Sequence, residues 1–278
     1  VKAIVPMFSK DSWEFHGEFH DFPARNVIPK PYQKPHPPLW VACSNIQTIG
    51  QAGSWGMGAL GFTFVSPDAA EAWVNKYYNN LLNNQAKLTE YPANPNIAMV
   101  AGFMCAETDE EAYEKAAGWT FFIFALSYYG RNGVDAPGEG DLWKEFQEWR
   151  YTEKAQAAFD GALIGSPDTI RKKLRIFQES NVDQVILLNQ AGNTTHEDIC
   201  GSLQMFAEEI MPEFHADEDR HAQWKADVMS RKTILEDLDT QPHAIFSHQN
   251  EDIVRLTPDQ LKARMAKKDA KKAAAGDD

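Results

Sequence analysis

A short apolar run followed by small polar side chains offers the clearest chemistry in this sequence. Residues 39–43 read Leu-Trp-Val-Ala-Cys, which is typical of a buried strand, and a helical pattern starts at Ser44. A helix start leaves backbone N–H groups unpaired at the positive end of the helix dipole, and such groups bind phosphate. Ser44, Gln47 and Thr48 add side-chain donors. The alternative is that Ser44 and Gln47 only form a capping box, and these residues alone favour that alternative.

Aromatic side chains gather at two further places. Phe62 and Phe64 alternate on one face of an expected strand, where their rings could stack on a planar ligand or an apolar substrate; packing in the core is an equal alternative. Residues 119–129 include Trp119 and Phe122 and are too aromatic for a surface helix with a single apolar face. This segment packs into a large core or forms the wall of an apolar pocket, and the core is the favoured interpretation.

Amides and histidines give weaker indications. Asn189 and Gln190 end another apolar run, where they suit the mouth of an active site or cap the following loop. His16 and His20 have the spacing of a metal pair only in a helix, and the surrounding prolines argue against a helix. His196 suits the first turn of a capped helix better than it suits an acid–base pair. No GxGxxG or GxxxxGK[ST] run occurs, so neither a dinucleotide site nor a P-loop is supported, and no catalytic acid or base can be assigned.

Composition narrows the class of protein. The 278 residues carry 40 acidic and 27 basic side chains, a net charge of −13, which disfavours nucleic acid and anionic membranes as partners. No apolar run approaches the roughly 18 residues of a membrane span. Cys43, Cys105 and Cys200 are far apart and show no CxxC spacing, so we predict no disulfide framework and no metal site. The sequence begins at Val1 without a signal-peptide pattern, and a cytoplasmic protein is therefore expected.

The elements that position these residues follow a regular alternation. Apolar runs at 39–43, 59–64, 97–104 and 182–188 are the expected strands, and a helical pattern follows each. The predicted helix starts are Ser44 with Gln47, Thr108 with Glu111, Thr194 with Glu197, and Ser166 before Pro167. Repeated strand–helix units with fully apolar strands predict an α/β fold with a parallel sheet, either doubly wound or a (β/α)8 barrel. Four strands are half of what a barrel needs, so the chain forms an open domain or half of a barrel.

The two flanks depart from this alternation. Seven prolines in residues 1–38 predict an extended connection without a helix or a central strand. Residues 215–278 are polar and predict a partly disordered extension, with one helix within 217–238 and another starting at Thr257. The expected globular part is 39–214, with an unfamiliar insertion around 130–160.

Two blocks of the sequence resemble the bacterial luciferase-like, flavin-dependent monooxygenases. The first block is Phe15-His-Gly-Glu-Phe with Pro29-Lys-Pro-Tyr-Gln-Lys-Pro-His-Pro-Pro-Leu-Trp, which is similar to the connection into the fifth strand of that family's TIM barrel. The second is Gly165-Ser-Pro-Asp-Thr-Ile with Asn181-Val-Asp-Gln-Val-Ile-Leu-Leu and the helix that ends at Pro212, similar to the seventh helix, eighth strand and closing helix. The similar segments cover residues 13–66 and 96–214.

The resemblance implies a TIM (β/α)8 barrel of the luciferase-like type, of which this chain holds the C-terminal half, strands five to eight. The first four strands, with many residues around the flavin ring, would then precede Val1. Matched position by position, the residues that meet the flavin phosphate are Ala42, Cys43, Ser44, Gln47 and Thr48. Cys43 is a departure, because luciferase itself has a glutamate at the matching position, so the contact at Cys43 could come through the backbone alone.

The implied activity is that of a flavin-dependent oxidoreductase, a monooxygenase that uses reduced FMN and O2 on a small apolar organic molecule. A deazaflavin enzyme that transfers hydride with coenzyme F420 is the close alternative, and a non-catalytic partner subunit is a second. The candidates for the substrate pocket are Phe62, Phe64, Trp119, Phe122, Asn189 and Gln190. The expected partners are the substrate, O2, a flavin reductase and a second copy of the chain in a dimer or larger homo-oligomer.

Overall fold

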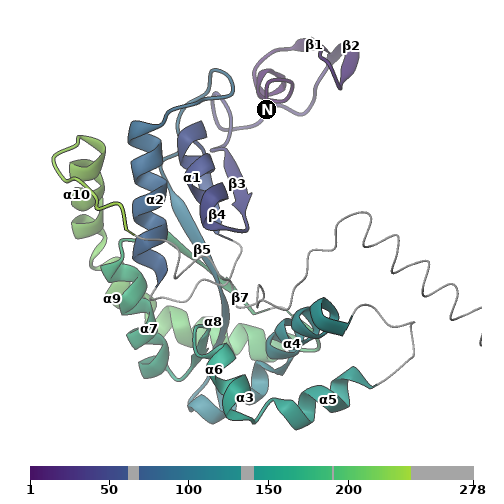
Figure 1. The fold of residues 1–278 in the computed structure, drawn as a ribbon, viewed down its shortest axis with the longest axis vertical. Helices are drawn as coiled ribbons and strands as arrows, with labels where there is room; N and C mark the ends of the chain where they lie inside the picture. The colour runs from purple at the N-terminus through teal and green to yellow at the C-terminus, as the bar shows by residue number, and fades with distance from the viewer. Residues whose placement is uncertain (62–68, 133–140, 190, 239–278) are drawn as a thin grey trace, which may run out of the picture.

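The fold is built around a parallel sheet whose strands come from distant parts of the chain. The computed structural model describes residues 1–61, 69–132, 141–189 and 191–238. The sheet contains β3 (Trp40–Cys43), β4 (Gly58–Gly61), β5 (Ile97–Cys105), β6 (Leu163–Gly165) and β7 (Gln184–Leu188). All of its pairings are parallel, and β3, β4, β5 and β7 are neighbours in that order (Figure 1). The predicted parallel order of the four apolar runs is confirmed.

The long central strand β5 holds the sheet together because it pairs on both sides. Its first residues pair with β4 (Ala59↔Ile97), residues 98–102 pair with β7, and its last residues pair with β6 (Phe103↔Leu163). The sequence did not predict β6, because three apolar residues are shorter than the runs that mark a strand. Within the described residues β3 and β7 pair on one side only, so the sheet is open and no closed barrel is seen.

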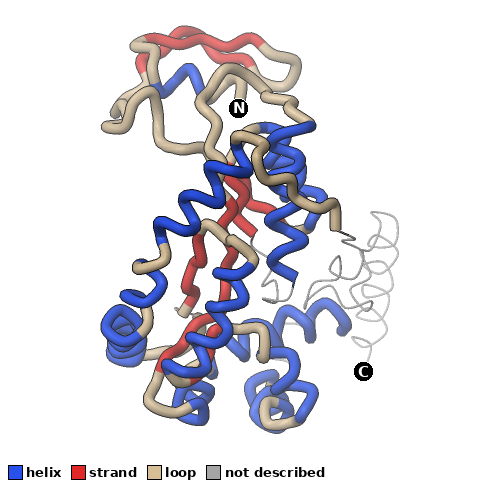
Figure 2. The backbone as a smooth tube through the Cα atoms, turned by 90° about the vertical axis from the view of Figure 1, so that its left-hand side faces the viewer, coloured by secondary structure: helices blue, strands red, loops and turns tan. Residues whose placement is uncertain are grey.

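Helices pack on both faces of this sheet, with α1 and α2 on one face and α4 on the other. Figure 2 shows several of them lying in front of the strands. Their bounds are α1 (Ile46–Trp55), α2 (Ala70–Asn83), α3 (Asp109–Lys115), α4 (Ala117–Asn132), α5 (Leu142–Trp149), α6 (Glu153–Phe159), α7 (Pro167–Glu179), α8 (His196–Glu209), α9 (Met211–His215) and α10 (Glu218–Met229). The insertion that the sequence placed around 130–160 includes the helices α5 and α6. The helix predicted within 217–238 is α10, and Thr257 lies outside the described residues.

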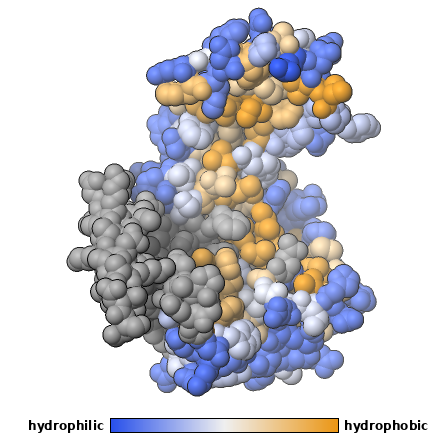
Figure 3. Space-filling model, turned by 90° about the vertical axis from the view of Figure 1, so that its right-hand side faces the viewer, coloured by the Kyte–Doolittle hydropathy of each residue, from blue (hydrophilic) through white to orange (hydrophobic). Residues whose placement is uncertain are grey.

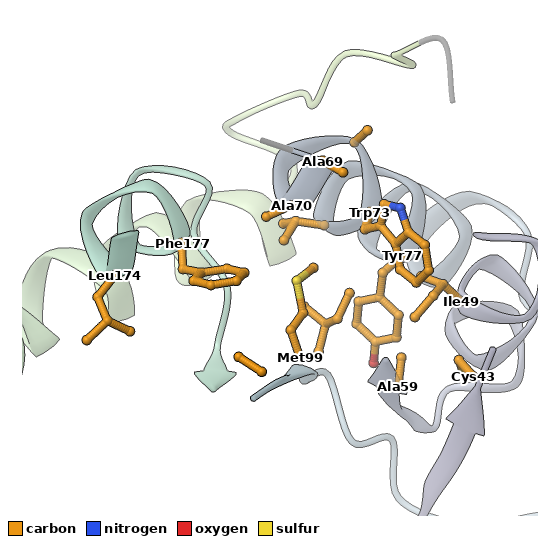
Figure 4. Packing of buried hydrophobic residues seen from close by; sticks show 14 of the residues in the cluster. Cys43, Ile49, Ala59, Ala69, Ala70, Trp73, Tyr77, Met99, Leu174 and Phe177 are labelled. Atoms are coloured by element: carbon orange, nitrogen blue, oxygen red, sulfur yellow. The ribbon is translucent and has the colours of Figure 1, made fainter. Parts of the chain in front are cut away.

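The main core lies between the sheet and its helices, and its members alternate along the strands. Figure 4 shows Trp73 and Tyr77 of α2 beside Ile49 of α1, with Met99 of β5 below them. All four of these side chains are essentially inaccessible to solvent. Burying a large apolar side chain contributes about 1.5–3 kcal/mol, so this layer fixes how α1 and α2 lie on β3, β4 and β5.

Residues 1–38 contain more regular structure than the prolines predicted. A 3-10 helix spans Val5–Phe8 and an antiparallel hairpin is formed by β1 (Ser12–His16) and β2 (Asp21–Asn26). Figure 1 shows the hairpin beyond the amino-terminal ends of β3 and β4. Proline is compatible with both elements: it fits the first positions of a short helix, and a two-stranded hairpin gives each strand an unpaired edge. The sequence did not predict the short helix or the hairpin, but β1 and β2 lie outside the parallel sheet, so neither of them is a central strand.

A buried carboxylate ties α10 to the amino-terminal end of the sheet. Asp183, just before β7, accepts hydrogen bonds from the Tyr78 hydroxyl (2.8 Å), the Ile97 amide (2.8 Å), His221 Nε2 (2.9 Å) and Lys225 Nζ (2.9 Å). Its side chain is 3% exposed. Burial raises the pKa of Asp183, but the hydrogen bonds from His221 and Lys225 outweigh burial and lower it overall. The carboxylate is therefore charged and paired at neutral pH.

Candidate functional site

The carboxyl ends of the parallel strands bring the sequence-predicted residues to one edge of the sheet. Parallel α/β proteins place their active sites at this edge, because the loops that follow the strands meet there. Ser44 follows β3, Asn189 follows β7, and the segment after β5 leads into α3 and α4. Phe62, Phe64 and Gln190 lie outside the described residues, so the structure does not test them.

The helix after β3 starts one residue later than the sequence predicted. Asn45, not Ser44, is the N-cap: its Oδ1 accepts a hydrogen bond from Thr48 N (2.8 Å), and the Thr48 hydroxyl accepts one from Asn45 N (3.2 Å). Both halves of a capping box are therefore present, with Asn45 and Thr48 in place of Ser44 and Gln47. The prediction that Ser44 caps the helix was wrong, because an asparagine one residue on has an amide oxygen that reaches the third amide of the helix equally well.

Two of the candidate side chains take no part in capping the helix. Ser44 and Gln47 are both exposed, and no hydrogen bond to either side chain is found within the described residues. The amides of Ile46 and Gln47 likewise have no partner among these residues, since the first intrahelical bond is from Ile49 N to Asn45 O. The start of α1 thus offers two backbone donors and two side-chain donors, of which the Ser44 and Gln47 side chains are exposed while Ile46 is buried.

Charge distinguishes this helix start from the others at the same edge. The first turn of α1 contains no acidic residue, whereas the first turn of α3 contains Asp109 and the first turn of α8 contains Glu197. The start of α7 is filled by the Asp109 carboxylate, which accepts hydrogen bonds from Ser166 N (2.6 Å) and the Thr169 hydroxyl (2.9 Å). The hydrogen bond from Ser166 N lowers the pKa of Asp109. Among these helices, the described start of α1 is the one that favours an added anion.

Ala42 and Cys43 point to opposite faces of β3. The Cys43 side chain is buried against α1, and its Sγ lies 3.4 Å from Thr48 O. Burial raises the pKa of this thiol to about 11, so it stays protonated and faces away from solvent. Ala42 is exposed on the inner face of the sheet. Neither side chain supplies a donor to a ligand, which leaves the backbone as the means of contact at these two positions.

The aromatic helix α4 covers the inner face of β5 and also presents rings to solvent. Trp119 is 2% exposed, and its indole lies so close to Gly102 that a Cβ there would come within 2.1 Å of it. Trp119 therefore belongs to the core, one of the two interpretations that the sequence left open. Phe122, Leu126 and Tyr129 are each about 40% exposed and lie at i, i+4 and i+7, so they form one apolar stripe along α4.

Asn189 is buried at the carboxyl end of β7. Its side chain is 7% exposed, and its Nδ2 has no hydrogen-bond partner within the described residues. A buried donor without a partner costs about 1–3 kcal/mol, so such a group calls for an acceptor. Asn189 is for this reason the one candidate from the sequence that the structure shows as an unsatisfied polar group at this edge.

The histidines are separated from this edge or paired within their own elements. His16 lies in the hairpin, with its Nδ1 2.9 Å from Asp21 Oδ1. His196 is in the first turn of α8, whose N-cap is Thr195 rather than the predicted Thr194. His196 Nε2 lies 3.5 Å from Cys200 Sγ, one turn along the same exposed helix face. The described residues contain no cluster of three histidine, cysteine, aspartate or glutamate side chains that could hold a metal ion.

Comparison with known proteins decides the family. The family model of luciferase-like monooxygenases matches residues 1–184, about two thirds of the chain. The chain belongs to the luciferase-like monooxygenase family. A comparison with curated protein sequences gives no match. No helix in the described ranges is both long enough and apolar enough to cross a membrane.

Solved structures share the fold of this luciferase-like chain. Monooxygenase RslO1 from Streptomyces bottropensis is 21% identical with a TM-score of 0.55, and the match covers 77% of this chain and 59% of that one. Coenzyme F420 dependent tetrahydromethanopterin reductase from Methanopyrus kandleri is 19% identical with a TM-score of 0.56, over 77% and 61%. An F420-dependent secondary alcohol dehydrogenase in complex with an F420-acetone adduct is 15% identical with a TM-score of 0.50, over 74% and 57%. The chain thus matches about three fifths of the length of these structures.

The sequence did not predict a role for three residues at this edge. Asn45 had a detectable signal, since Asn-x-x-Thr has the spacing of a capping box as Ser-x-x-Gln does. Asp109 follows the predicted cap Thr108, but its bond to Ser166, 57 residues away, leaves no local signal in the sequence. Gly102 lies inside an apolar strand, where an isolated glycine indicates a close approach without naming the partner.

Proposed function

We propose that this protein is a flavin-dependent oxidoreductase that binds the phosphate of its cofactor at the start of α1. The observation that carries the proposal is the unoccupied set of donors there: the amides of Ile46 and Gln47, the Ser44 hydroxyl and the Gln47 amide, with no carboxylate in the first turn. Backbone donors at the positive end of a helix dipole hold phosphate in many unrelated proteins. Membership of the luciferase-like family supports the same cofactor class.

Each residue of this turn has a separate role in the proposal. Ser44 donates its hydroxyl to a phosphate oxygen, and Gln47 donates its side-chain amide from one turn into the helix. Thr48 and Asn45 act on the helix rather than on the ligand, because they are bonded to each other. The small side chain of Ala42 leaves the inner face of β3 open beside the turn.

The redox chemistry itself belongs to the cofactor. Bound flavin supplies two-electron transfer, and the protein contributes anchoring, orientation and a pocket that excludes water. Asn189 is suited to position a carbonyl or hydroxyl oxygen at the mouth of this pocket, because its Nδ2 is buried and lacks an acceptor within the described residues. No acid or base for the reaction is assigned within this chain.

The proposed substrate is a small apolar organic molecule. Phe122, Leu126 and Tyr129 present an apolar stripe on α4. Figure 3 shows hydrophobic side chains gathered in the middle of the side of the molecule on which α4 lies in Figure 1. A contiguous exposed apolar surface of this kind marks a binding site more often than a plain solvent-facing surface. Phe122 therefore stays a candidate for the substrate pocket, whereas Trp119 acts by filling the space over Gly102.

The cofactor is either FMN, with O2 as the oxidant, or coenzyme F420 in a hydride transfer. The family description names monooxygenases, while two of the similar structures are F420-dependent enzymes, so both cofactors belong to the proposal. A third possibility is a non-catalytic partner subunit that keeps the fold. A flavin reductase as partner, a homodimer or larger homo-oligomer, and a cytoplasmic location complete the proposal.

We further propose that β3, β4, β5 and β7 are the last four strands of a barrel. Their parallel pairing in chain order is the arrangement that strands five to eight of a TIM barrel have. The open edges of β3 and β7 and the exposed Ala42 on the inner face support this, because a barrel interior is a packed core. In such a barrel, the two edges pair with further strands.

The test is cofactor binding by the complete protein. FMN and F420 are titrated separately into the purified apoprotein, and quenching of their fluorescence gives the two dissociation constants. Binding of one cofactor, followed by turnover of O2 with a reductant or by hydride transfer, supports an enzyme of the corresponding type. Binding without either activity supports the partner subunit, and failure of both cofactors to bind contradicts the proposal.

A further inference from the structure

A cavity lies at the same edge of the sheet, between the insertion and the loop after β7. Its volume is about 480 Å³, within the range of roughly 300–1,000 Å³ that small-molecule sites occupy. It is bounded by the α3–α4 junction, by α5, and by the loop 192–195 with the first turn of α8. Nothing in the flavin proposal uses this cavity, and its lining shares no residue with the start of α1.

One wall of the cavity is aromatic. The rings of Phe121 and Trp143 meet edge to face, with their centroids 5.1 Å apart. Trp143 is 48% exposed, although Phe146, one turn further along α5, is fully buried. An indole has a large apolar area to cover, and tryptophan is enriched where a ligand or a partner completes its burial. Trp143 therefore presents a ring face that a flat ligand can cover.

Another part of the lining is glycine backbone. Gly118 and Gly192 line the cavity, and neither can carry a side chain without a clash: a Cβ on Gly118 would lie 1.9 Å from Ala191 O, and one on Gly192 would lie 2.7 Å from Gly118. Gly192 also has a positive φ of 66°. These close contacts place the loop after β7 directly on α4, so the cavity is bounded there by glycine backbone, and its aromatic wall is the surface that a planar ring can cover.

Charged side chains line the other end of the cavity. Glu114 is already paired with Arg150 (3.3 Å) and accepts a hydrogen bond from the Tyr151 hydroxyl (2.7 Å). Asp198 shares Lys115 Nζ (3.3 Å) with Glu111 (2.8 Å), so one cation lies between two carboxylates. The Thr195 hydroxyl and Lys115 lower the pKa of Asp198, so this carboxylate is charged at neutral pH. The carboxylates retain acceptor capacity for a further donor. The net charge of −13 on the whole chain also favours a cation over an anion.

We propose that this cavity binds a flat aromatic molecule that carries a protonated amine, with the ring against Trp143 and the amine beside Asp198. The proposal goes beyond the flavin function and does not depend on it. It places a second ligand site at the edge where the loops after β5 and β7 meet, and this site recognises aromatic amines.

Isothermal titration calorimetry of the complete protein tests the proposal with three probes that share one ring system: tryptamine, indole and indole-3-acetate. We expect tryptamine to bind at least about tenfold more tightly than indole-3-acetate, with indole between them. Asp198→Asn should weaken tryptamine binding at least about threefold and leave indole unchanged. Trp143→Ala should weaken both at least about tenfold. The matched control is Glu197→Gln, which removes one charge from the same helical turn but does not line the cavity.

Each result decides the matter. Circular dichroism melts establish that the variants fold, and if Trp143→Ala does not, the Asp198→Asn comparison decides alone. Equal affinity for tryptamine and indole-3-acetate, or an equal effect of Glu197→Gln and Asp198→Asn, would overturn the amine site. Absence of tryptamine binding at millimolar concentration would overturn the cavity as a ligand site. None of these outcomes measures the binding of FMN or F420, so the flavin proposal is tested separately by cofactor titration.

Discussion

Replacing Asp183 by alanine tests how the sheet is fastened to the helix that closes its amino-terminal end. The variant removes the acceptor of four hydrogen bonds, from Tyr78, Ile97, His221 and Lys225, at a side chain that is 3% exposed. Tyr78 and Lys225 keep other acceptors, at Pro95 O (3.1 Å) and Asn96 Oδ1 (2.7 Å), whereas the Ile97 amide loses the partner that the carboxylate supplied.

The expected loss follows from these contacts. Removing one partner of a buried, hydrogen-bonded ion pair costs about 3–5 kcal/mol, because the remaining charges and donors stay buried without compensation. In a domain of this size 1 kcal/mol shifts the melting temperature by about 2–4 °C, so we expect a fall of about 6–20 °C. Thermal melts of the complete protein, followed by circular dichroism at neutral pH, measure this fall.

A matched control separates the effect of losing a buried carboxylate from the effect of losing one negative charge. Asp160 is 86% exposed and lies 3.8 Å from Lys173, so Asp160→Ala should cost at most about 1 kcal/mol. The reasoning is refuted if Asp183→Ala melts within about 2 °C of the unmodified protein, or if the two alanine variants melt together.

Three further predictions concern the same contacts and the candidate site. The pKa of Asp183 is lower in the folded protein than the ordinary value of about 3.9, so Asp183 stabilises the fold fully above about pH 4 and loses this effect on further acidification. The difference in stability between the unmodified protein and Asp183→Asn should therefore shrink below that pH. A difference that does not change with pH contradicts the pairing. Asn45→Ala should destabilise the protein by about 0.5–2 kcal/mol in denaturant melts and Ser44→Ala by less than about 0.5 kcal/mol, since only Asn45 caps α1; equal losses would restore Ser44 as the cap. Gly102→Ala should cost about 1–3 kcal/mol because the new methyl group meets Trp119, and a neutral effect would show that the indole moves aside.

The sequence predicts the sheet better than the details around it. Apolar runs and helix starts are local signals, and they were sufficient for the order and direction of β3, β4, β5 and β7. The hairpin was not predicted because proline density disfavours only a helix or a central strand and gives no signal for an antiparallel pair, which tolerates proline at its edges. Strand β6 was missed because its three residues owe their extended form to the neighbour β5 rather than to their own pattern.

The candidate site shows the same limit. The turn after β3 was located from its sequence, but the identity of the cap was not, because Ser44 and Asn45 both have partners at the correct spacing and only backbone geometry chooses between them. The partners of Asp109 and Gly102 lie far along the chain, and sequence spacing carries no information about such contacts. The role of Trp119 in the core or in a pocket likewise depends on the residue on which its indole packs, which is Gly102.

The central claim is that the cofactor phosphate is bound at the start of α1, and the dissociation constant of the flavin in Ser44→Ala tests it most directly. A hydrogen bond to a charged group contributes about 1.5–3 kcal/mol, so the variant of the complete protein should bind FMN or F420, whichever the unmodified protein binds, roughly 10- to 150-fold more weakly. Because Ser44 does not cap the helix, the melting temperature of the Ser44→Ala variant should equal that of the unmodified protein. Unchanged flavin affinity in a folded Ser44→Ala protein would contradict the account.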